Sequence, residues 1–250
     1  ITNTKRMKKI ILYVIIGLIS CLDLHAYKPI GGYDEARIAA DVAKADSLYN
    51  IKEFSAANNL LEPIAFLDYN EKNYPWPAAL HLFGKVLRYG FDDCEHGRQL
   101  YEICVEELDY VPAYYDLGQY WWGNNCSIYH DCAKGFKYWL QGARKGDAQC
   151  QYEVAYVYSY GLVQAGIEDK DFDKGAKYLK MALKQNHPDA YWLYGVYLRE
   201  CIGGICAEYF PQWLDAWIEG AKLGSYKCAE SIHYDQSGEH QFCKQFGLHD

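Results

Sequence analysis

The sequence predicts an all-α protein built as a row of antiparallel helix pairs. Three observations lead to this prediction. One stripe of apolar and small residues at helical spacing recurs four times, a similar second helix follows each stripe, and the interval between stripes varies little. With 25 Tyr and 7 Trp but only 7 Pro among 250 residues, the chain has the composition of an ordered protein.

The stripe marks the first helix of each pair. The chain aligns on small residues at Gly84, Gly118, Ala155 and Gly195, which lie 34, 37 and 40 residues apart. The stripe occupies positions −4, −1, 0 and +3, which share one face of an amphipathic helix. Its members are Leu80, Phe83, Gly84 and Leu87; Tyr114, Leu117, Gly118 and Trp121; Gln151, Val154, Ala155 and Tyr158; and Tyr191, Tyr194, Gly195 and Leu198. We expect the central small residue to let a neighbouring helix backbone approach closely.

A second helix follows each stripe. The segments that align as second helices are 96–108, 134–146, 174–186 and 212–224. Gly146, Asn186 and Gly224 close three of them, and each suits the left-handed conformation that ends many helices. Asp131 precedes one such helix as an expected N-cap. An earlier pair is expected over 35–50 and 53–68, which makes five units, with a remnant from Tyr226 onward.

The repeat pattern has a relative among known families. The residues that carry it are Gly118, Lys134, Gly135, Tyr138, Gly142, Ala143, Gly146, Asp147 and Ala148. This pattern resembles the Sel1-like repeat, which is related to the tetratricopeptide repeat. The resemblance covers residues 78–225 well and 34–69 loosely, and it is degraded at Leu108, Gln212 and Ala216. It implies an α-solenoid of antiparallel helix pairs, a right-handed superhelix that binds proteins or peptides without catalysis or cofactors.

In such a superhelix the first helices line the concave side. Positions −3, +1 and +4 of each first helix are then expected to face a partner-binding groove. These positions hold His81, Lys85 and Arg88; Tyr115, Gln119 and Trp122; Tyr152, Tyr156 and Ser159; and Trp192, Val196 and Arg199. One end of the row is basic and the middle is aromatic, and aromatic and Arg side chains are common binding anchors. We expect an extended segment or an acidic tail of a partner; the alternative is that these side chains pack against long inter-helix loops.

The N-terminus has the features of a secretory signal. Two lysines follow Met7, and an apolar run then extends over 10–19, which is too short for a transmembrane helix of roughly 20 residues. Two endings of the signal remain open. Residues 18–21 resemble the bacterial lipobox, which would place a lipid on Cys21, whereas ordinary cleavage after Ala26 would leave no lipid. The expected protein is therefore exported, as a periplasmic or outer-membrane-anchored lipoprotein or as a secreted protein, with membrane contact only through such an anchor.

The chain accordingly divides into four parts. These are a signal peptide over 1–26, a degenerate helix pair over 34–69, four repeats over 78–225, and a C-terminal cap or tail over 226–250.

Ten cysteines without a C-x-x-C motif favour an oxidising compartment and disulfides. The candidates bracket inter-helix loops or tie down the tail: Cys126 with Cys132, Cys201 with Cys206, and Cys228 with Cys243. They resemble the repeat-internal disulfides of cysteine-rich Sel1-like proteins, although the spacings here are shorter and irregular.

Two further cysteines share one expected helix. Cys94 and Cys104 would lie about 15 Å apart along it, too far to pair with each other. Cys104 and Cys150 are expected either as small buried thiols or as partners across units. A redox or nucleophilic cysteine is disfavoured because no histidine partner is evident.

The charge and the motif content of the chain disfavour other function classes. Beyond residue 20 the chain carries 21 basic and 33 acidic residues, about −12 in net charge, which disfavours a nucleic-acid partner. No metalloprotease, nucleophile-elbow, P-loop or S-x-x-K motif is present. The tail residues His233, Asp235, Glu239, His240 and Cys243 are metal-ligand types, but their spacing favours a solvated tail. An envelope hydrolase, β-lactamase-like or peptidoglycan-active, with an unrecognised site stays open as the alternative to a scaffold.

Overall fold

The computed structural model describes residues 35–65, 76–123, 131–208 and 212–236, and in these ranges all regular secondary structure is helical. The α-helices are α2 (Glu35–Asn50), α3 (Phe54–Ala65), α4 (Trp76–Gly90), α5 (Cys94–Glu106), α6 (Ala113–Trp122), α7 (Cys132–Arg144), α8 (Ala148–Tyr160), α9 (Phe172–Lys184), α10 (Pro188–Glu200), α11 (Gln212–Lys222) and α12 (Tyr226–Gln236). Two 3-10 turns, η1 (Val163–Ala165) and η2 (Ile202–Gly204), lie between them. The predicted all-α class is confirmed.

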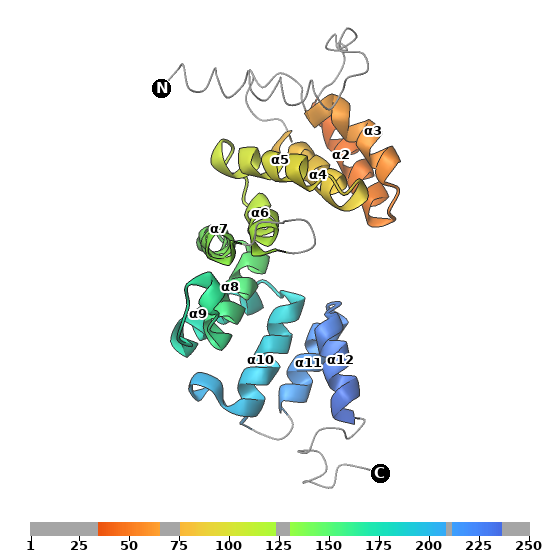
Figure 1. Cartoon of the computed structure of the whole chain (residues 1–250). Helices are drawn as coiled ribbons and strands as arrows, with labels where there is room; N and C mark the ends of the chain where they lie inside the picture. Colours follow the sequence, from red (N-terminus) through yellow and green to blue (C-terminus); the bar gives the residue numbers. More distant parts are fainter. Residues whose placement is uncertain (1–34, 66–75, 124–130, 209–211, 237–250) are drawn as a thin grey trace.

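The helices form a curved row of pairs. Each first helix packs against the helix that follows it, giving the pairs α2/α3, α4/α5, α6/α7, α8/α9 and α10/α11. First helices also contact one another along the row, from α6 to α8, α8 to α10 and α10 to α12. In Figure 1 the row bends so that α6 and α8 lie on its inner side and α7 and α9 on its outer side. None of the helices within the described ranges is both long and apolar enough to span a membrane.

In two of the pairs, a tryptophan of the second helix packs directly against a glycine of the first helix. A Cβ atom on Gly118 would overlap the ring of Trp139, and one on Gly195 would overlap the ring of Trp217. Each indole nitrogen donates to the carbonyl oxygen three residues before its glycine, at 3.2 Å in the first pair and 3.1 Å in the second. The expected close approach at the small residue is therefore confirmed, and the second helix supplies the ring that fills it.

A second glycine contact joins successive units. A Cβ atom on Gly142 would lie 2.6 Å from the sulfur of Cys150 in the next first helix. Gly220 meets Cys228 of α12 in the same way. The C-terminal helix α12 thus stacks on the row as the first helix of a further unit.

The helix ends follow the expected chemistry. The carboxylate of Asp131 caps α7 by accepting from the Lys134 amide at 2.9 Å. Gly146, Asn186 and Gly224 have φ angles of +101°, +54° and +96°, the left-handed values expected after α7, α9 and α11.

The disulfide predictions have mixed outcomes. Cys201 and Cys206 form a disulfide as expected, with their Cα atoms 4.2 Å apart. Cys132 and Cys228 are free thiols, so the expected Cys126–Cys132 and Cys228–Cys243 pairs are wrong. Cys228 is fully buried against α11, where its sulfur fills the space above a glycine, and burial raises the pKa of its thiol to about 11.

The other cysteines fit the expectations where the structure describes them. Cys104 and Cys150 are buried free thiols, and burial raises the pKa of each. Cys94 shares α5 with Cys104 and is disulfide-bonded, although not to it. Cys21, Cys126 and Cys243 lie outside the described residues.

Candidate functional site

The residues predicted to line the groove all lie on the first helices, but the row is not uniformly open. Arg88 is 2% exposed, Gln119 is 9% exposed and Ser159 is 3% exposed, so the expectation that they face a groove is wrong. First helices contact one another along the row, which places some of these side chains between helices. The hydroxyl groups of Ser159 and Tyr197, for example, are 2.6 Å apart between α8 and α10.

The basic end of the row is engaged within the protein. The Nε2 atom of His81 lies 2.7 Å from the buried carboxylate of Asp116, and Arg88 donates to the Asp116 backbone carbonyl at 3.3 Å. The ammonium group of Lys85 lies over the ring of Tyr49, 4.7 Å from its centroid. These internal contacts remove the argument for an acidic partner that the sequence offered at this end.

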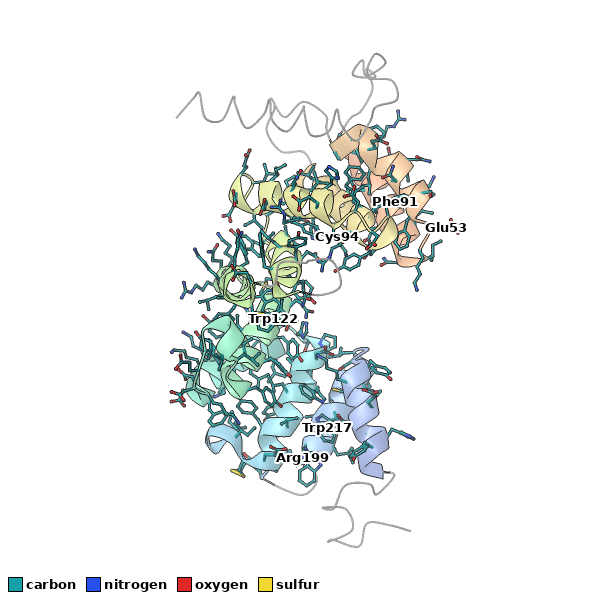
Figure 2. The ribbon with its side chains drawn as sticks, in the orientation of Figure 1. Glu53, Phe91, Cys94, Trp122, Arg199 and Trp217 are labelled. Carbon is teal, nitrogen blue, oxygen red and sulfur yellow. A yellow bond between two sulfur atoms is a disulfide. The ribbon has the colours of Figure 1, made fainter. Side chains whose placement is uncertain are left out.

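The aromatic middle of the row is partly buried. Trp122, at the end of α6 (Figure 2), packs with its ring centroid 4.6 Å from that of Trp139. Burial raises the pKa of Tyr115 well above its ordinary value. Both side chains therefore contribute to packing between helices as well as to the inner surface.

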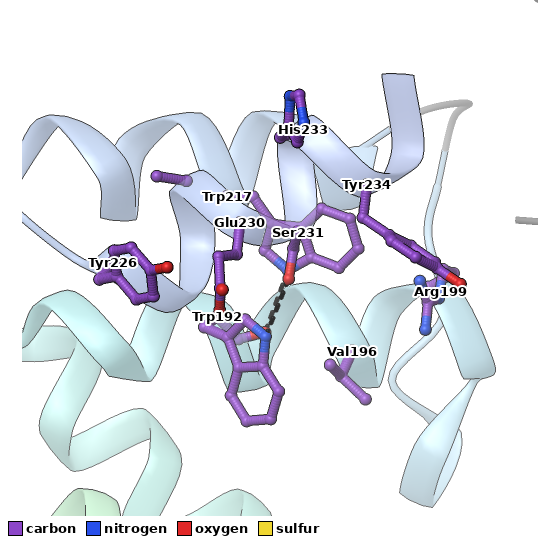
Figure 3. Close-up of a pocket in the computed structure, with 10 residues that line it drawn as sticks. Trp192, Val196, Arg199, Trp217, Tyr226, Glu230, Ser231, His233 and Tyr234 are labelled. Carbon is purple, nitrogen blue, oxygen red and sulfur yellow. Dashed lines mark hydrogen bonds between the residues drawn. The ribbon is translucent and has the colours of Figure 1, made fainter. Parts of the chain in front are cut away.

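Two adjoining cavities lie at the C-terminal end of the row. The larger, the α10–α12 pocket, has a volume of about 730 Å³ (Figure 3). Its walls include Trp192, Val196, Arg199, Trp217, Tyr226 and Tyr234. The smaller, the α8–α12 pocket, has a volume of about 420 Å³. Its walls include Tyr152, Glu153, Tyr156, Trp192, Lys227 and Glu230.

Trp192 is the wall between these cavities. Its indole nitrogen donates to the Ser231 hydroxyl at 3.1 Å, which ties α10 to α12 (Figure 3). On the far side of the larger pocket, the guanidinium of Arg199 lies 5.3 Å from the ring centroid of Trp217. Hence both pockets have aromatic faces that are held in place by hydrogen bonds and cation–π contacts.

Lys227 of α12 closes one side of the α8–α12 pocket. Its ammonium group donates to the Tyr152 hydroxyl at 2.7 Å and lies 3.2 Å from the carboxylate of Asp189. It also lies over two rings, 4.7 Å from the centroid of Tyr152 and 5.7 Å from that of Trp192. The ring of Tyr152 also stacks on the ring of His187, with the two centroids 5.2 Å apart.

Glu153 contributes the carboxyl group of the α8–α12 pocket. It accepts a hydrogen bond from Gln149 Nε2 at 3.1 Å, and it forms no ion pair with any described residue. Burial raises the pKa of this carboxyl group to about 7. The pocket thus combines aromatic faces with a carboxyl group that titrates near neutral pH.

Neither Glu153 nor Lys227 was among the residues predicted from the sequence. Glu153 lies at −2 from Ala155, a position that was assigned to neither stripe nor groove. Lys227 lies in the segment assigned as a cap or tail. A signal for α12 was present, because G-S-Y-K-C at 224–228 matches G-D-A-Q-C at 146–150 in spacing, which places Cys228 where Cys150 stands.

Across residues 35–65, 76–123, 131–208 and 212–236, no three His, Cys, Asp or Glu side chains come together as potential metal ligands. Of the tail residues considered as ligands, Glu239, His240 and Cys243 lie outside the described residues.

Comparison with known structures identifies the class of this fold. A Sel1 repeat protein from Oxalobacter formigenes aligns with a TM-score of 0.57 and 16% identity, covering 79% of this chain and 76% of its own. The protective antigen c5321 of uropathogenic Escherichia coli strains, which displays an SLR fold, aligns with a TM-score of 0.45 and 15% identity, covering 81% of this chain and 50% of its own. No protein-family model and no curated protein sequence matches the chain.

The first of these likenesses shows the fold. The chain has an α-solenoid fold similar to that of the Sel1 repeat protein, which is the fold that the resemblance in sequence implied.

Proposed function

We propose that this chain is a non-enzymatic scaffold that binds an extended segment of a protein partner along the inner side of α8, α10 and α12. The observation that carries the proposal is the pair of adjoining pockets that share Trp192. Two neighbouring pockets along one helix row suit an extended chain, whose successive side chains can occupy them in turn. The aromatic walls of these open pockets supply the area that a bound segment would bury.

Exposed aromatic side chains at the rim support a protein partner. Tyr226 is 73% exposed and Tyr234 is 49% exposed, and both line the α10–α12 pocket. Aromatic rings left in water beside a pocket mark surfaces that other proteins cover.

Substitution at the rim tests the proposal. We expect the double variant Tyr156→Ala with Tyr226→Ala to lose the partners that the wild-type protein captures from bacterial envelope extracts, as identified by mass spectrometry. Tyr156 and Tyr226 line the two pockets, and their loss leaves the glycine–tryptophan packing untouched.

The matched control changes two exposed aromatic residues at the other end of the row. Tyr89→Ala with Phe91→Ala removes side chains that are 48% and 47% exposed and should retain the same partners. Circular dichroism establishes that all variants remain helical. Equal capture by the wild-type protein and the pocket variant would reject the proposal.

We also propose that the protein works in the bacterial cell envelope. The support is the signal-like segment over 1–26 in the sequence, together with the Cys201–Cys206 disulfide, a bond that persists in oxidising compartments. Mass spectrometry of the mature N-terminus tests this. A lipid on Cys21 or a start at Tyr27 agrees with export, whereas a mature chain that retains the segment from Met7 contradicts it.

A further inference from the structure

We infer that the α8–α12 pocket receives a cationic side chain, lysine or arginine, from the bound segment; the inference rests on the proposed function. It identifies which residue of the partner this pocket selects. Three features of the pocket carry it: the carboxyl group of Glu153, the aromatic faces beside it, and the balance of charge around it.

Within the described ranges, the carboxyl group has no cation in direct contact with it. The ammonium group of Lys227 is near enough to act against the rise in its pKa, but Lys227 is bound to the Tyr152 hydroxyl and to the carboxylate of Asp189. Glu153 accepts a hydrogen bond from the neutral amide of Gln149, and no described residue forms an ion pair with it. A carboxylate removed from water is stabilised by a paired cation and by further hydrogen bonds. An ammonium or guanidinium group in the pocket would provide both.

The aromatic walls suit the same ligand. The rings of Tyr156 and Trp192, which both line the pocket, lie with their centroids 6.4 Å apart at an interplanar angle of 29°. Cations are attracted to the faces of such rings. The protein already uses this wall for a cation of its own, because the ammonium group of Lys227 lies over Tyr152 and Trp192.

The surrounding charges leave the pocket receptive to a cation. Lys227 is paired with Asp189, and Glu230 of α12 adds another carboxylate to the wall. Burial lowers the pKa of His187, so its ring is neutral at pH 8.

From α6, Tyr115 faces Glu153, and burial keeps this phenol protonated by raising its pKa. The chain as a whole carries a net charge of −8, which attracts basic segments.

Binding to degenerate peptide pools tests the inference on the full chain. The probes are fluorescent nine-residue pools with random positions around a fixed central Arg, Lys, Gln or Glu. We expect the Arg and Lys pools to bind at least about tenfold more tightly than the Glu pool, since a cation–π contact and an ion pair are both lost there. Binding of all pools without such a preference would overturn the inference while the proposed function stands. Binding of none of the pools would overturn the proposed function and the inference with it.

The variant Glu153→Gln identifies the group responsible. Ionisation of a carboxyl group whose pKa is about 7 should strengthen binding of the Arg pool about tenfold between pH 6 and pH 8. Glu153→Gln should abolish that rise while keeping the shape of the side chain. The matched control is Glu62→Gln, at an exposed position on α3, and this variant should retain the rise in affinity with pH. The same pH profile in the wild-type protein and Glu153→Gln would overturn the assignment.

Discussion

At the scale of single residues, buried polar side chains on the first helices hold neighbouring units together. The carboxylate of Asp116 forms a hydrogen bond with the His81 ring of the preceding unit. The hydroxyl group of Ser159 forms one with the Tyr197 hydroxyl of the following unit. Removing the partner of a buried hydroxyl or carboxyl group destabilises the folded protein, because the group that remains can form a hydrogen bond neither with the protein nor with water. These side chains therefore specify how one unit sits on the next, which an apolar stripe does only loosely.

Glu153 makes the stability of the protein depend on pH. Its pKa is raised from the ordinary 4.5 to about 7, so the folded state holds its proton more firmly than the unfolded state. The stabilisation is present below about pH 4.5 and is lost as the pH rises through 7. Compared with Glu153→Gln, the wild-type protein should become less stable by roughly 1–3 kcal/mol between pH 5 and pH 8, because the group is only partly buried.

Denaturant unfolding of both proteins at several pH values measures this difference. The difference between the two unfolding free energies isolates Glu153 from other titrating groups. A constant difference across the range would show that the carboxyl group ionises normally.

At the scale of helices, glycines set how closely neighbouring elements approach. Gly142→Leu should destabilise the protein by about 1–3 kcal/mol, because its side chain would collide with Cys150 and Tyr114 of neighbouring helices. Ala133→Leu on the exposed face of the same helix is the control and should change stability by less than about 0.5 kcal/mol. Chemical denaturation compares the two, and equal stabilities would mean that α7 can move away from its neighbours freely.

The disulfide after α10 also stabilises at this scale. Cys201 and Cys206 close a loop with a sequence separation of 5, for which the loss of chain entropy predicts about 2 kcal/mol. Replacing both with serine should lower the unfolding free energy by about that amount under oxidising conditions. Cys132→Ser, which removes a free thiol, serves as the comparison and should leave stability nearly unchanged. An unaltered melting temperature in the double-serine variant would contradict the prediction.

At the scale of the whole molecule, stability should vary along the row. Among the described helices each unit contacts mainly its neighbours, and within these ranges the pair α2/α3 has a neighbouring pair on one side only. Hydrogen exchange followed by mass spectrometry should therefore show the slowest exchange in α6 to α9 and faster exchange in α2. Uniform protection from α2 to α11 would mean that the row unfolds as one cooperative body.

The sequence predicted the row of pairs because each unit repeats the same local rule. A small residue such as Gly118 or Gly195, and a helix-ending residue such as Gly146 or Asn186, can be recognised within a single unit, and the structure confirms them. Contacts between distant units are not visible in that way. Neighbouring first helices bury Arg88 and Tyr152, and Cys228 packs on a glycine of the previous unit. The periodicity of the sequence therefore assigned these residues to a helix face but did not show which other unit covers that face.

The position of Trp192 between two pockets has a consequence for recognition. A single indole forms a surface of both cavities and is fixed by one hydrogen bond to Ser231. A side chain of the bound segment that shifts the Trp192 ring as it enters one cavity would also alter the shape of the other cavity. Adjacent positions of a bound segment would then be selected jointly, and the preferred residue at one position would depend on its neighbour.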